Sequence, residues 1–273
     1  MQLRERLAIT LEIAELAGRH IHEARQQQNF KQHYKQGSEL VTEVDVAVDQ
    51  LIAEHLESRF PGEARLTEEL SPERGALGQG GPLWVVDPID GTVNFAHGLP
   101  HVAVSIAWAQ DGEVQLGVVH APFLDETFTA MRGDGAYLNG QRIRTSLATR
   151  LERSLIATGF PYQRDGRAPL MRRLAAVMMH CQDMRRCGSA ALDLCNVACA
   201  RLDAYYESVS PWDFAAGLLI AREAGARTGH LYPCPDGIPE ELYGEHIVAA
   251  APDIYKTLEA LLIHADENHI NEQ

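Results

Sequence analysis

Apolar residues recur every three or four positions along the first sixty residues, which is the period of an α-helix. They predict an amphipathic first helix whose apolar face carries Leu3, Leu7, Leu11, Ala14, Gly18 and Ile21. A second helical pattern spans residues 44–56 and ends before Pro61, with Asp45 near its start. Lys35 opens the segment 35–38, which we expect to be a loop. The chain should therefore begin with two helices that cover a core.

Short apolar runs bounded by turn residues follow, which is the pattern of an antiparallel sheet. Strands are predicted over residues 83–86, 102–109, 113–120, 127–131 and 137–138. Asp111-Gly112, between the second and third runs, is typical of a hairpin turn. We expect a surface loop over residues 71–82, ahead of the first strand.

Beyond residue 145 the pattern changes, and strands alternate with helices. The predicted strands are 154–158, 183–186, 203–207 and 246–250, and the predicted helices are 168–180, 189–200, 212–224 and 253–265. This alternation is typical of an α/β layer. We therefore predict an α/β fold in two parts, an N-terminal α+β half (residues 1–145) and a C-terminal α/β half (residues 146–273).

Composition narrows the classes of function. The 273 residues suffice for one large domain or two small ones. A net charge of −14, from 38 acidic against 24 basic residues, argues against a nucleic-acid-binding surface. The surplus of acid is compatible with a site at which cations hold an anionic substrate. Because no apolar stretch has the form of a signal peptide or the length of a membrane span, we expect a soluble cytoplasmic protein without a membrane partner.

The cysteines are odd in number and lack the spacing of a metal site, which favours reduced thiols. They are Cys181, Cys187, Cys195, Cys199 and Cys234. Cys195 and Cys199 stand four apart on a predicted helix, so they share one face. We expect them to be part of the core, because two thiols alone do not make a zinc site.

Two carboxylates end the apolar strand that is predicted to start at residue 83. An ionised carboxylate is very costly to bury without a partner, and no Lys or Arg stands nearby in the sequence around Asp87 and Asp90. Pro88 stiffens the link between the two acids and directs them toward a common point. Oxygen ligands in this arrangement suit Mg²⁺, which proteins hold with one or two carboxylates plus a substrate phosphate.

Gly91 and Thr92 follow these acids, and the residues after them can open a short helix. The first N–H groups of such a helix would face an anion, so that metal and phosphate would meet at one place. The alternative interpretation of this stretch is an Asp-rich turn, since Asp, Pro and Gly all favour turns.

The segment WVVDPIDGTVNFAHGLP, residues 84–100, resembles the signature of the inositol monophosphatase family, which comprises magnesium-dependent, lithium-sensitive phosphomonoesterases. Upstream, Leu66–Leu70 (LTEEL) resembles the paired-glutamate element of that family, and downstream, Pro211–Gly217 (PWDFAAG) resembles its second signature. The three motifs stand in the order that the family requires, and the similarity runs from the first helix to about Ala251. The resemblance implies a layered α-β-α-β-α sandwich with the active site between its two halves.

The resemblance also implies a ligand set for two to three Mg²⁺ ions. Glu68, Asp87 and the backbone carbonyl of Ile89 would hold the first ion. Asp87, Asp90 and Asp213 would hold the second, so that Asp87 bridges the pair. A third, more weakly bound ion would be held by Glu68 and water molecules.

Catalytic roles carried over from the family fall on Glu68, Thr92 and Asp45. The first is a carboxylate that takes a proton from the attacking water, and Asp45 polarises the Thr92 hydroxyl. A first-turn acid favoured by the helix dipole is the alternative for Asp45. The amides of Gly91 and Thr92 would hold the phosphate, and Lys35 matches a family basic residue near the metal site.

The alcohol half of the substrate is assigned by the resemblance to Ser189, Ala190, Glu207 and Asp213. Ser189, after Gly188, is also a plausible helix N-cap, and capping alone is its alternative role. A strand-end acid exposed to solvent is the alternative for Glu207. The expected reaction is hydrolysis of a small phosphorylated polyol, inositol-1-phosphate first, by a homodimeric enzyme.

Rival functions share the Asp-Pro-Ile/Leu-Asp-Gly-Thr core. They are phosphatases of histidinol phosphate, fructose-1,6-bisphosphate and 3′-phosphoadenosine 5′-phosphate. One bacterial branch of the family also associates with the transcription antitermination machinery, so a role as a binding partner stays open. Cys187 and the pair Cys199-Ala200 depart from the common family pattern, which puts substrate preference in question more than chemistry.

Overall fold

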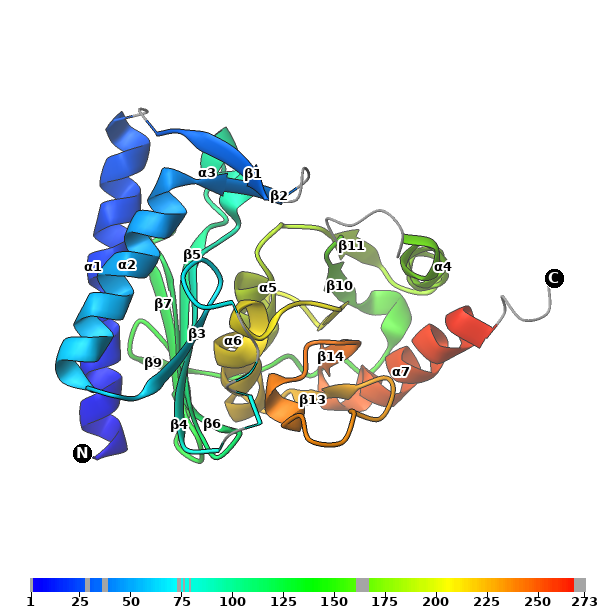
Figure 1. The fold of residues 1–273 in the computed structure, drawn as a ribbon. Coiled ribbons are helices and arrows are strands. Elements are labelled where there is room, and N and C mark those ends of the chain that lie inside the picture. The colour runs from blue at the N-terminus through cyan, green and yellow to red at the C-terminus, as the bar shows by residue number, and fades with distance from the viewer. Residues whose placement is uncertain are drawn as a thin grey trace.

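The computed structural model describes residues 2–27, 30–35, 39–72, 75, 77–78, 80–160 and 167–267. These residues form five layers, in the order helix, sheet, helix, sheet, helix (Figure 1). The predicted α/β sandwich is therefore confirmed. Within the described residues, none of the helices has both the length and the apolar character needed to cross a membrane.

Helices α1 (Leu3–Gln27) and α2 (Glu43–Arg59) form the first outer layer, as the sequence pattern predicts (Figure 1). Their apolar faces pack on one side of the larger sheet in a cluster that includes Ile13, Ala17, Val48, Ile52, Trp84, Val86, Ile106 and Val118. Burial of these side chains, rather than helix propensity, supplies most of the stability of such helices.

The larger sheet has seven strands that lie in chain order. They are β3 (Ala64–Thr67), β4 (Pro82–Asp90), β5 (Ala103–Gln110), β6 (Glu113–Ala121), β7 (Glu126–Met131), β8 (Gly135–Leu138) and β9 (Gln141–Ile143). Only the β3–β4 pair is parallel, and the other neighbours are antiparallel. The hairpin predicted around Asp111-Gly112 is the connection between β5 and β6.

The smaller sheet has five strands in the order β11-β10-β12-β14-β13. Their bounds are β10 (Leu155–Thr158), β11 (Asp183–Arg185), β12 (Ala204–Glu207), β13 (Arg227–His230) and β14 (Ile247–Ala250). Strand β10 runs parallel to both β11 and β12, and the pairs β12–β14 and β13–β14 are antiparallel. A short 3-10 turn, η2 (Leu151–Arg153), precedes this sheet, and another, η3 (Glu240–Leu242), precedes β14.

Helices α5 (Ala190–Ala198) and α6 (Pro211–Glu223) form the layer between the sheets (Figure 1). They share one apolar cluster with both sheets, which includes Val85, Ala107, Leu194, Phe214, Leu218, Tyr205 and Ala249. Helices α4 (Arg167–Met178) and α7 (Pro252–Glu267) cover the far side of the smaller sheet. The larger sheet comes from residues 64–143 and the smaller from residues 155–250, and the division into halves at residue 145 stays a prediction.

The structure corrects several local expectations. Lys35 ends a strand, β1 (Gln32–Lys35), which pairs with β2 (Glu39–Thr42), so the expected loop is wrong there, and residues 36–38 lie outside the described residues. Strands β3, β9 and β13 were not anticipated, because each has only three or four residues and a mixed pattern. Strand β4 continues four residues past its expected end at Val86 and reaches Asp90.

Candidate active site

A bulge in β4 brings the two acids of this strand to the same side of the sheet. Residues three apart on a regular strand point to opposite faces. The register between β4 and β5 shifts between Asp87 and Asp90, and Pro88 within the shifted segment has no N–H for the ladder. The amide of Ile89 donates to Oδ1 of Asp87 at 2.9 Å, which fixes that carboxylate.

Asp213 approaches the same point from the first turn of α6. Ser210 and Asp213 form a capping box in which the Ser210 amide donates to Oδ2 of Asp213 at 2.7 Å, and Pro211 begins the helix. The Ser105 hydroxyl of β5 donates to the carbonyl of Trp212 at 3.1 Å, which ties this helix start to the sheet. One carboxylate oxygen from each of Asp87, Asp90 and Asp213 lies within 4.8 Å of the others.

Asp90 also accepts hydrogen bonds from the start of α5. Its Oδ2 receives the Ser189 hydroxyl at 2.6 Å and the Ala191 amide at 2.7 Å, and its Oδ1 receives the Ala190 amide at 3.3 Å. Ser189 in turn accepts the Leu192 amide at 3.3 Å, so its predicted role as N-cap is confirmed. A single carboxylate thus joins the acidic cluster to a helix from the other end of the chain.

Burial and mutual repulsion shape the ionisation of these acids. Burial raises the pKa of Asp87 well above its usual range, and the charges of Glu68, Asp90 and Asp213 add to this effect. Burial raises the pKa of Asp90 to about 6, although the hydrogen bonds from α5 oppose it. Burial, followed by the charge of Asp90, raises the pKa of Asp213 to about 8. Such a cluster of oxygen donors fits a hard divalent cation, which would neutralise the crowded charges.

Glu68 lies in the turn after β3, beside Asp87. Its amide donates to the carbonyl of Val86 at 3.2 Å, which continues the parallel pairing of β3 with β4. The influence of its charge on the pKa of Asp87 places the two carboxylates close together. The charge of Glu68 thus acts on Asp87, a member of the cluster formed by Asp87, Asp90 and Asp213.

Thr92 and Asp45 meet across 47 positions of sequence. The Thr92 hydroxyl lies 2.7 Å from Oδ1 of Asp45 and 3.2 Å from the carbonyl of Ile89, and it can donate to either. Asp45 is fully buried, and its Oδ2 accepts the Thr42 amide at 2.8 Å in the capping box of α2. Burial raises the pKa of Asp45, while its hydrogen bonds from Thr42 and Thr92 lower it. Asp45 is thus both a first-turn helix acid and the partner of Thr92.

Gly91 caps the short helix α3 (Thr92–His97) with a left-handed backbone, φ 100°. A Cβ at this position would lie 2.7 Å from the carbonyl oxygen of His101, so both conformation and space require glycine. The side-chain amide of Asn94 donates to the carbonyls of His101 at 2.7 Å and Cys187 at 2.8 Å. The residues proposed for phosphate and for alcohol are therefore connected through Asn94.

A pocket of about 90 Å³ lies beside the acidic cluster. Its lining comprises Asp90, Gly159, Phe160, Arg186, Gly188, Ser189, Ala190, Asp193, Glu207, Val209 and Asp213. Glu207 ends β12, where its Oε2 accepts the Tyr205 hydroxyl at 2.5 Å, and burial raises its pKa to about 7. The alternative interpretation of Glu207, an acid exposed to solvent at the end of a strand, is therefore wrong. Ser189, Ala190, Glu207 and Asp213, all predicted to bind the alcohol, share this pocket.

The sequence did not identify five residues of the pocket lining, Gly159, Phe160, Arg186, Asp193 and Val209, and three of these bear on the acids. Arg186 faces the acids, and its positive charge lowers the pKa values of Asp90 and Glu207 against the effect of burial. Asp193 is buried one turn into α5, and burial and the charge of Glu207 raise its pKa well above the usual range. Gly159 leaves room for Glu207, since a Cβ there would lie within 2.2 Å of its carboxylate. Arg186 stands just before Gly188, which is the one sequence signal that could have found it.

Cysteines and Lys35 add little to this site. All five thiols are free, as expected, and Cys195 is buried in the core. Cys199 is the C-cap of α5 and does not line the pocket. Cys187 precedes Gly188, and its carbonyl accepts from Asn94. The side chain of Lys35 lies outside the described part of the chain, so its proposed place near the metal stays a prediction.

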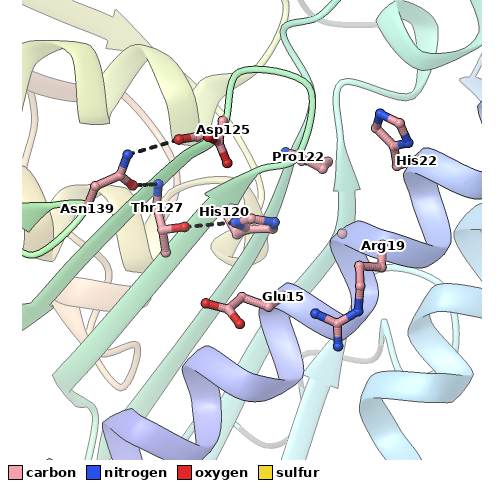
Figure 2. A pocket seen from close by; sticks show the side chains of 9 residues that line it. Glu15, Arg19, His22, His120, Pro122, Asp125, Thr127 and Asn139 are labelled. Carbon is pink, nitrogen blue, oxygen red and sulfur yellow. Dashed lines mark hydrogen bonds between the residues drawn. The ribbon is translucent and has the colours of Figure 1, made fainter.

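A second pocket, of about 440 Å³, lies on the opposite side of the larger sheet (Figure 2). Figure 2 shows Glu15, Arg19 and His22 of α1 across from His120, whose ring nitrogen lies 2.9 Å from the Thr127 hydroxyl. The side chain of His120 packs against the bare backbone of Gly18. This pocket contains none of the predicted site residues, so pocket size does not locate the acidic cluster.

Known proteins resemble this chain over nearly its whole length. The profile of the inositol monophosphatase family matches residues 2–271. Nus factor SuhB of Vibrio cholerae is 39% identical over 268 residues, which cover 96% of each chain. Inositol monophosphatase 1 of Solanum lycopersicum is 38% identical over 257 residues, which cover 92% of each chain.

Solved structures of similar fold come from the same family. The crystal structure of extragenic suppressor protein suhB from Bartonella henselae is 35% identical, with a TM-score of 0.85, and the match covers 94% of this chain and 98% of that one. The Thermotoga maritima IMPase is 31% identical, with a TM-score of 0.84 over 97% and 99% of the two chains. The resemblance drawn from three motifs is confirmed. The chain belongs to the inositol monophosphatase family.

Proposed function

We propose that this chain is a Mg²⁺-dependent phosphomonoesterase that hydrolyses a small polyol phosphate, with inositol-1-phosphate as the first candidate. The observation that carries the proposal is the convergence of Asp87, Asp90 and Asp213 on one point, next to a pocket lined by polar side chains. Membership of the inositol monophosphatase family supports the same reaction class.

The donor set fits magnesium, because the three groups that converge are all carboxylate oxygens. Glu68, Asp87 and the carbonyl of Ile89 would hold one ion, and Asp87, Asp90 and Asp213 a second. A third, more weakly bound ion would be held by Glu68. Bound magnesium would neutralise part of the charge of the phosphate dianion and strengthen water as a nucleophile at neutral pH.

The protein residues would position the phosphate and move the proton. The amides of Gly91 and Thr92 would bind a phosphate oxygen at the start of α3. The Thr92 oxygen can accept a hydrogen bond from the attacking water and take its proton while the Thr92 hydroxyl proton passes to Asp45, and the Glu68 carboxylate is the alternative proton acceptor. The alcohol would be bound by Ser189, Ala190, Glu207 and Asp213, which line the same pocket.

A panel of phosphomonoesters, assayed for phosphate release with and without Mg²⁺, tests this proposal. Inositol-1-phosphate should be turned over faster than histidinol phosphate, fructose-1,6-bisphosphate and 3′-phosphoadenosine 5′-phosphate. A preference for one of these three would move the substrate assignment while keeping the reaction class.

Glu207→Gln should weaken discrimination among substrates more than it slows the reaction of a simple aryl phosphate. A charge-assisted hydrogen bond to a ring hydroxyl contributes about 1.5–3 kcal/mol, or about 10–100-fold in kcat/KM. Glutamine keeps an oxygen that can accept from Tyr205, so the local packing is preserved. The measurement is the ratio of kcat/KM for inositol-1-phosphate to that for an aryl phosphate in both proteins. An unchanged ratio would show that the alcohol is recognised elsewhere in the pocket.

Lithium should inhibit the enzyme at millimolar concentration. The proposed third cation site is held by few protein ligands, and a small monovalent ion can compete for it. A series of lithium concentrations at fixed Mg²⁺ measures the effect on phosphate release. A flat response would place this chain among lithium-resistant enzymes.

We also propose a second role, association with the transcription antitermination machinery. The observation that favours it is the name Nus factor SuhB, carried by relatives of Vibrio cholerae and Pasteurella multocida at 39% and 41% identity. Binding to purified antitermination proteins of the source organism tests this role. An Asp213→Asn variant that still binds would separate it from catalysis. The homodimer and the cytoplasmic location stay predictions.

A further inference from the structure

Asp49 is a buried acid that none of the family motifs contains. It lies on α2, one turn after Asp45, and its side chain is fully inaccessible to solvent. Its Oδ2 accepts the backbone amides of Glu69 at 3.1 Å and Leu70 at 2.9 Å. A buried carboxylate that binds two amides of one turn holds that turn firmly, because the bonds are charge-assisted and leaving the carboxylate without them is costly.

The turn held by Asp49 is the one that presents Glu68. At its start the Glu68 amide donates to the carbonyl of Val86, and at its end the Thr67 hydroxyl accepts the amides of Leu70 at 3.3 Å and Ser71 at 3.1 Å. Asp49 holds this turn from a separate helix, through the amides of Glu69 and Leu70. The direction of the Glu68 side chain toward Asp87 therefore depends on where α2 lies.

Helix α2 also carries Asp45, which accepts the Thr92 hydroxyl at 2.7 Å. Residues four apart lie on the same face of a helix, so Asp45 and Asp49 contact the site from one rigid element. One residue fixes Thr92, and the other fixes the turn of Glu68.

We propose that Asp49 is a positioning residue, which sets Glu68 at the distance from Thr92 that the metal and the attacking water require. This inference rests on the proposed function, in which Glu68 is a metal ligand. Asp49 is not one of the acids that converge at the proposed metal site, and it binds the backbone of the turn that presents Glu68, so its effect should pass through Glu68. A merely structural role would lower stability without changing the affinity for Mg²⁺.

The test compares Asp49→Ala, Asp49→Asn and the control Val48→Ala in the full chain. Val48 is the buried neighbour on α2 that packs in the apolar cluster with α1, so its truncation destabilises the same helix without touching the Glu68 turn. Titration calorimetry with Mg²⁺ alone measures affinity, amide hydrogen exchange at Glu69 and Leu70 measures the turn, and thermal melting measures stability.

Asp49→Ala should weaken Mg²⁺ binding about 10–100-fold, the range found when residues that orient metal ligands are removed. Exchange at the two amides should rise. Asp49→Asn retains an oxygen that can accept both amides, so it should recover a large part of the affinity. Val48→Ala should bind Mg²⁺ like the wild type despite a comparable loss of melting temperature.

The Glu68→Gln variant distinguishes the positioning role of Asp49 from the role of Glu68 as a metal ligand. If Asp49→Ala binds Mg²⁺ like the wild type while Glu68→Gln binds Mg²⁺ more weakly, the positioning role of Asp49 is overturned and the ligand role of Glu68 stands. Unchanged affinity in Glu68→Gln would overturn the ligand assignment on which that role depends. If Asp49→Ala does not fold, Asp49→Asn is compared with Val48→Ala, and equal affinities then overturn the inference.

Discussion

An Asp213→Asn variant should lose more than about 100-fold in kcat/KM while keeping its fold. Removing residues that only orient metal ligands already costs about 10–100-fold, and Asp213 would be a ligand itself. Asparagine has nearly the same shape and retains an oxygen that can accept the Ser210 amide, so the capping box of α6 can survive. Initial rates at saturating Mg²⁺ provide the measurement. The control is Asp253→Asn, which removes an exposed first-turn acid from α7 and should leave the rate unchanged.

The same substitution should stabilise the metal-free protein at alkaline pH. The pKa of Asp213 in the folded protein is about 8, whereas an unfolded Asp has a pKa of about 3.9. Between these values the folded state binds the proton more strongly, so the stability present below pH 4 is lost as pH rises toward about 8. Asp213→Asn removes this loss. Its melting temperature without metal should therefore exceed that of the wild type at pH 8–9 and depend less on pH. A variant that melts below the wild type there would contradict the assignment of a crowded, uncompensated acid.

Long periodic patterns predicted most of the fold, because they report burial directly. The helices α1, α2, α6 and α7 follow from apolar faces that the sequence displays over three or more turns. The β1–β2 hairpin was missed since its strands have four residues each and are largely polar. Strand β13, with the sequence RTGH, likewise depends on pairing with β14 rather than on its own pattern.

The acidic cluster could be predicted because two acids at the end of an apolar strand are costly to bury unless a cation or another partner binds them. The bulge that turns Asp87 and Asp90 to one side is harder to foresee, although Pro88 marks it. Asp193 and Asp49 could not be singled out from the sequence, and Arg186 could be found only from its place two positions before Gly188. Each is a common residue in an ordinary helix or loop, and its significance comes from partners that the fold brings to it, as in the contact of Asp49 with Glu69, 20 positions away.

Asn94 shows most clearly what a local sequence pattern cannot predict. In the sequence it is only one residue of the segment 84–100 that resembles the family signature. In the fold its amide joins α3 to the carbonyl of Cys187, 93 positions away, and so connects the phosphate side of the site to the alcohol side. A contact of this kind depends on the stacking of two sheets around α5 and α6, which no local pattern encodes.

Exhaustive chelation of divalent cations should reduce phosphate release to the uncatalysed background, and added Mg²⁺ should restore it. Enzymes accelerate such reactions at least about 10⁶-fold, and without a cation the groups that converge at this site are three acids, which do not neutralise a phosphate dianion. Ca²⁺ should not replace Mg²⁺. Magnesium prefers octahedral oxygen ligands at about 2.0–2.1 Å, whereas calcium takes more ligands at about 2.3–2.6 Å.

The carboxylates of this site have little freedom to adapt to the larger ion. Amides of Ile89, Ala191 and Ser210 hold Asp87, Asp90 and Asp213 respectively, and these amides belong to a strand bulge and two helix starts. Calcium would therefore bind in a geometry that does not favour transfer of the phosphoryl group to water. Rates after chelation and after addition of each cation, with melting curves to show that the chelated protein stays folded, provide the measurement. Full activity in the chelated, folded protein would refute the metal-dependent mechanism.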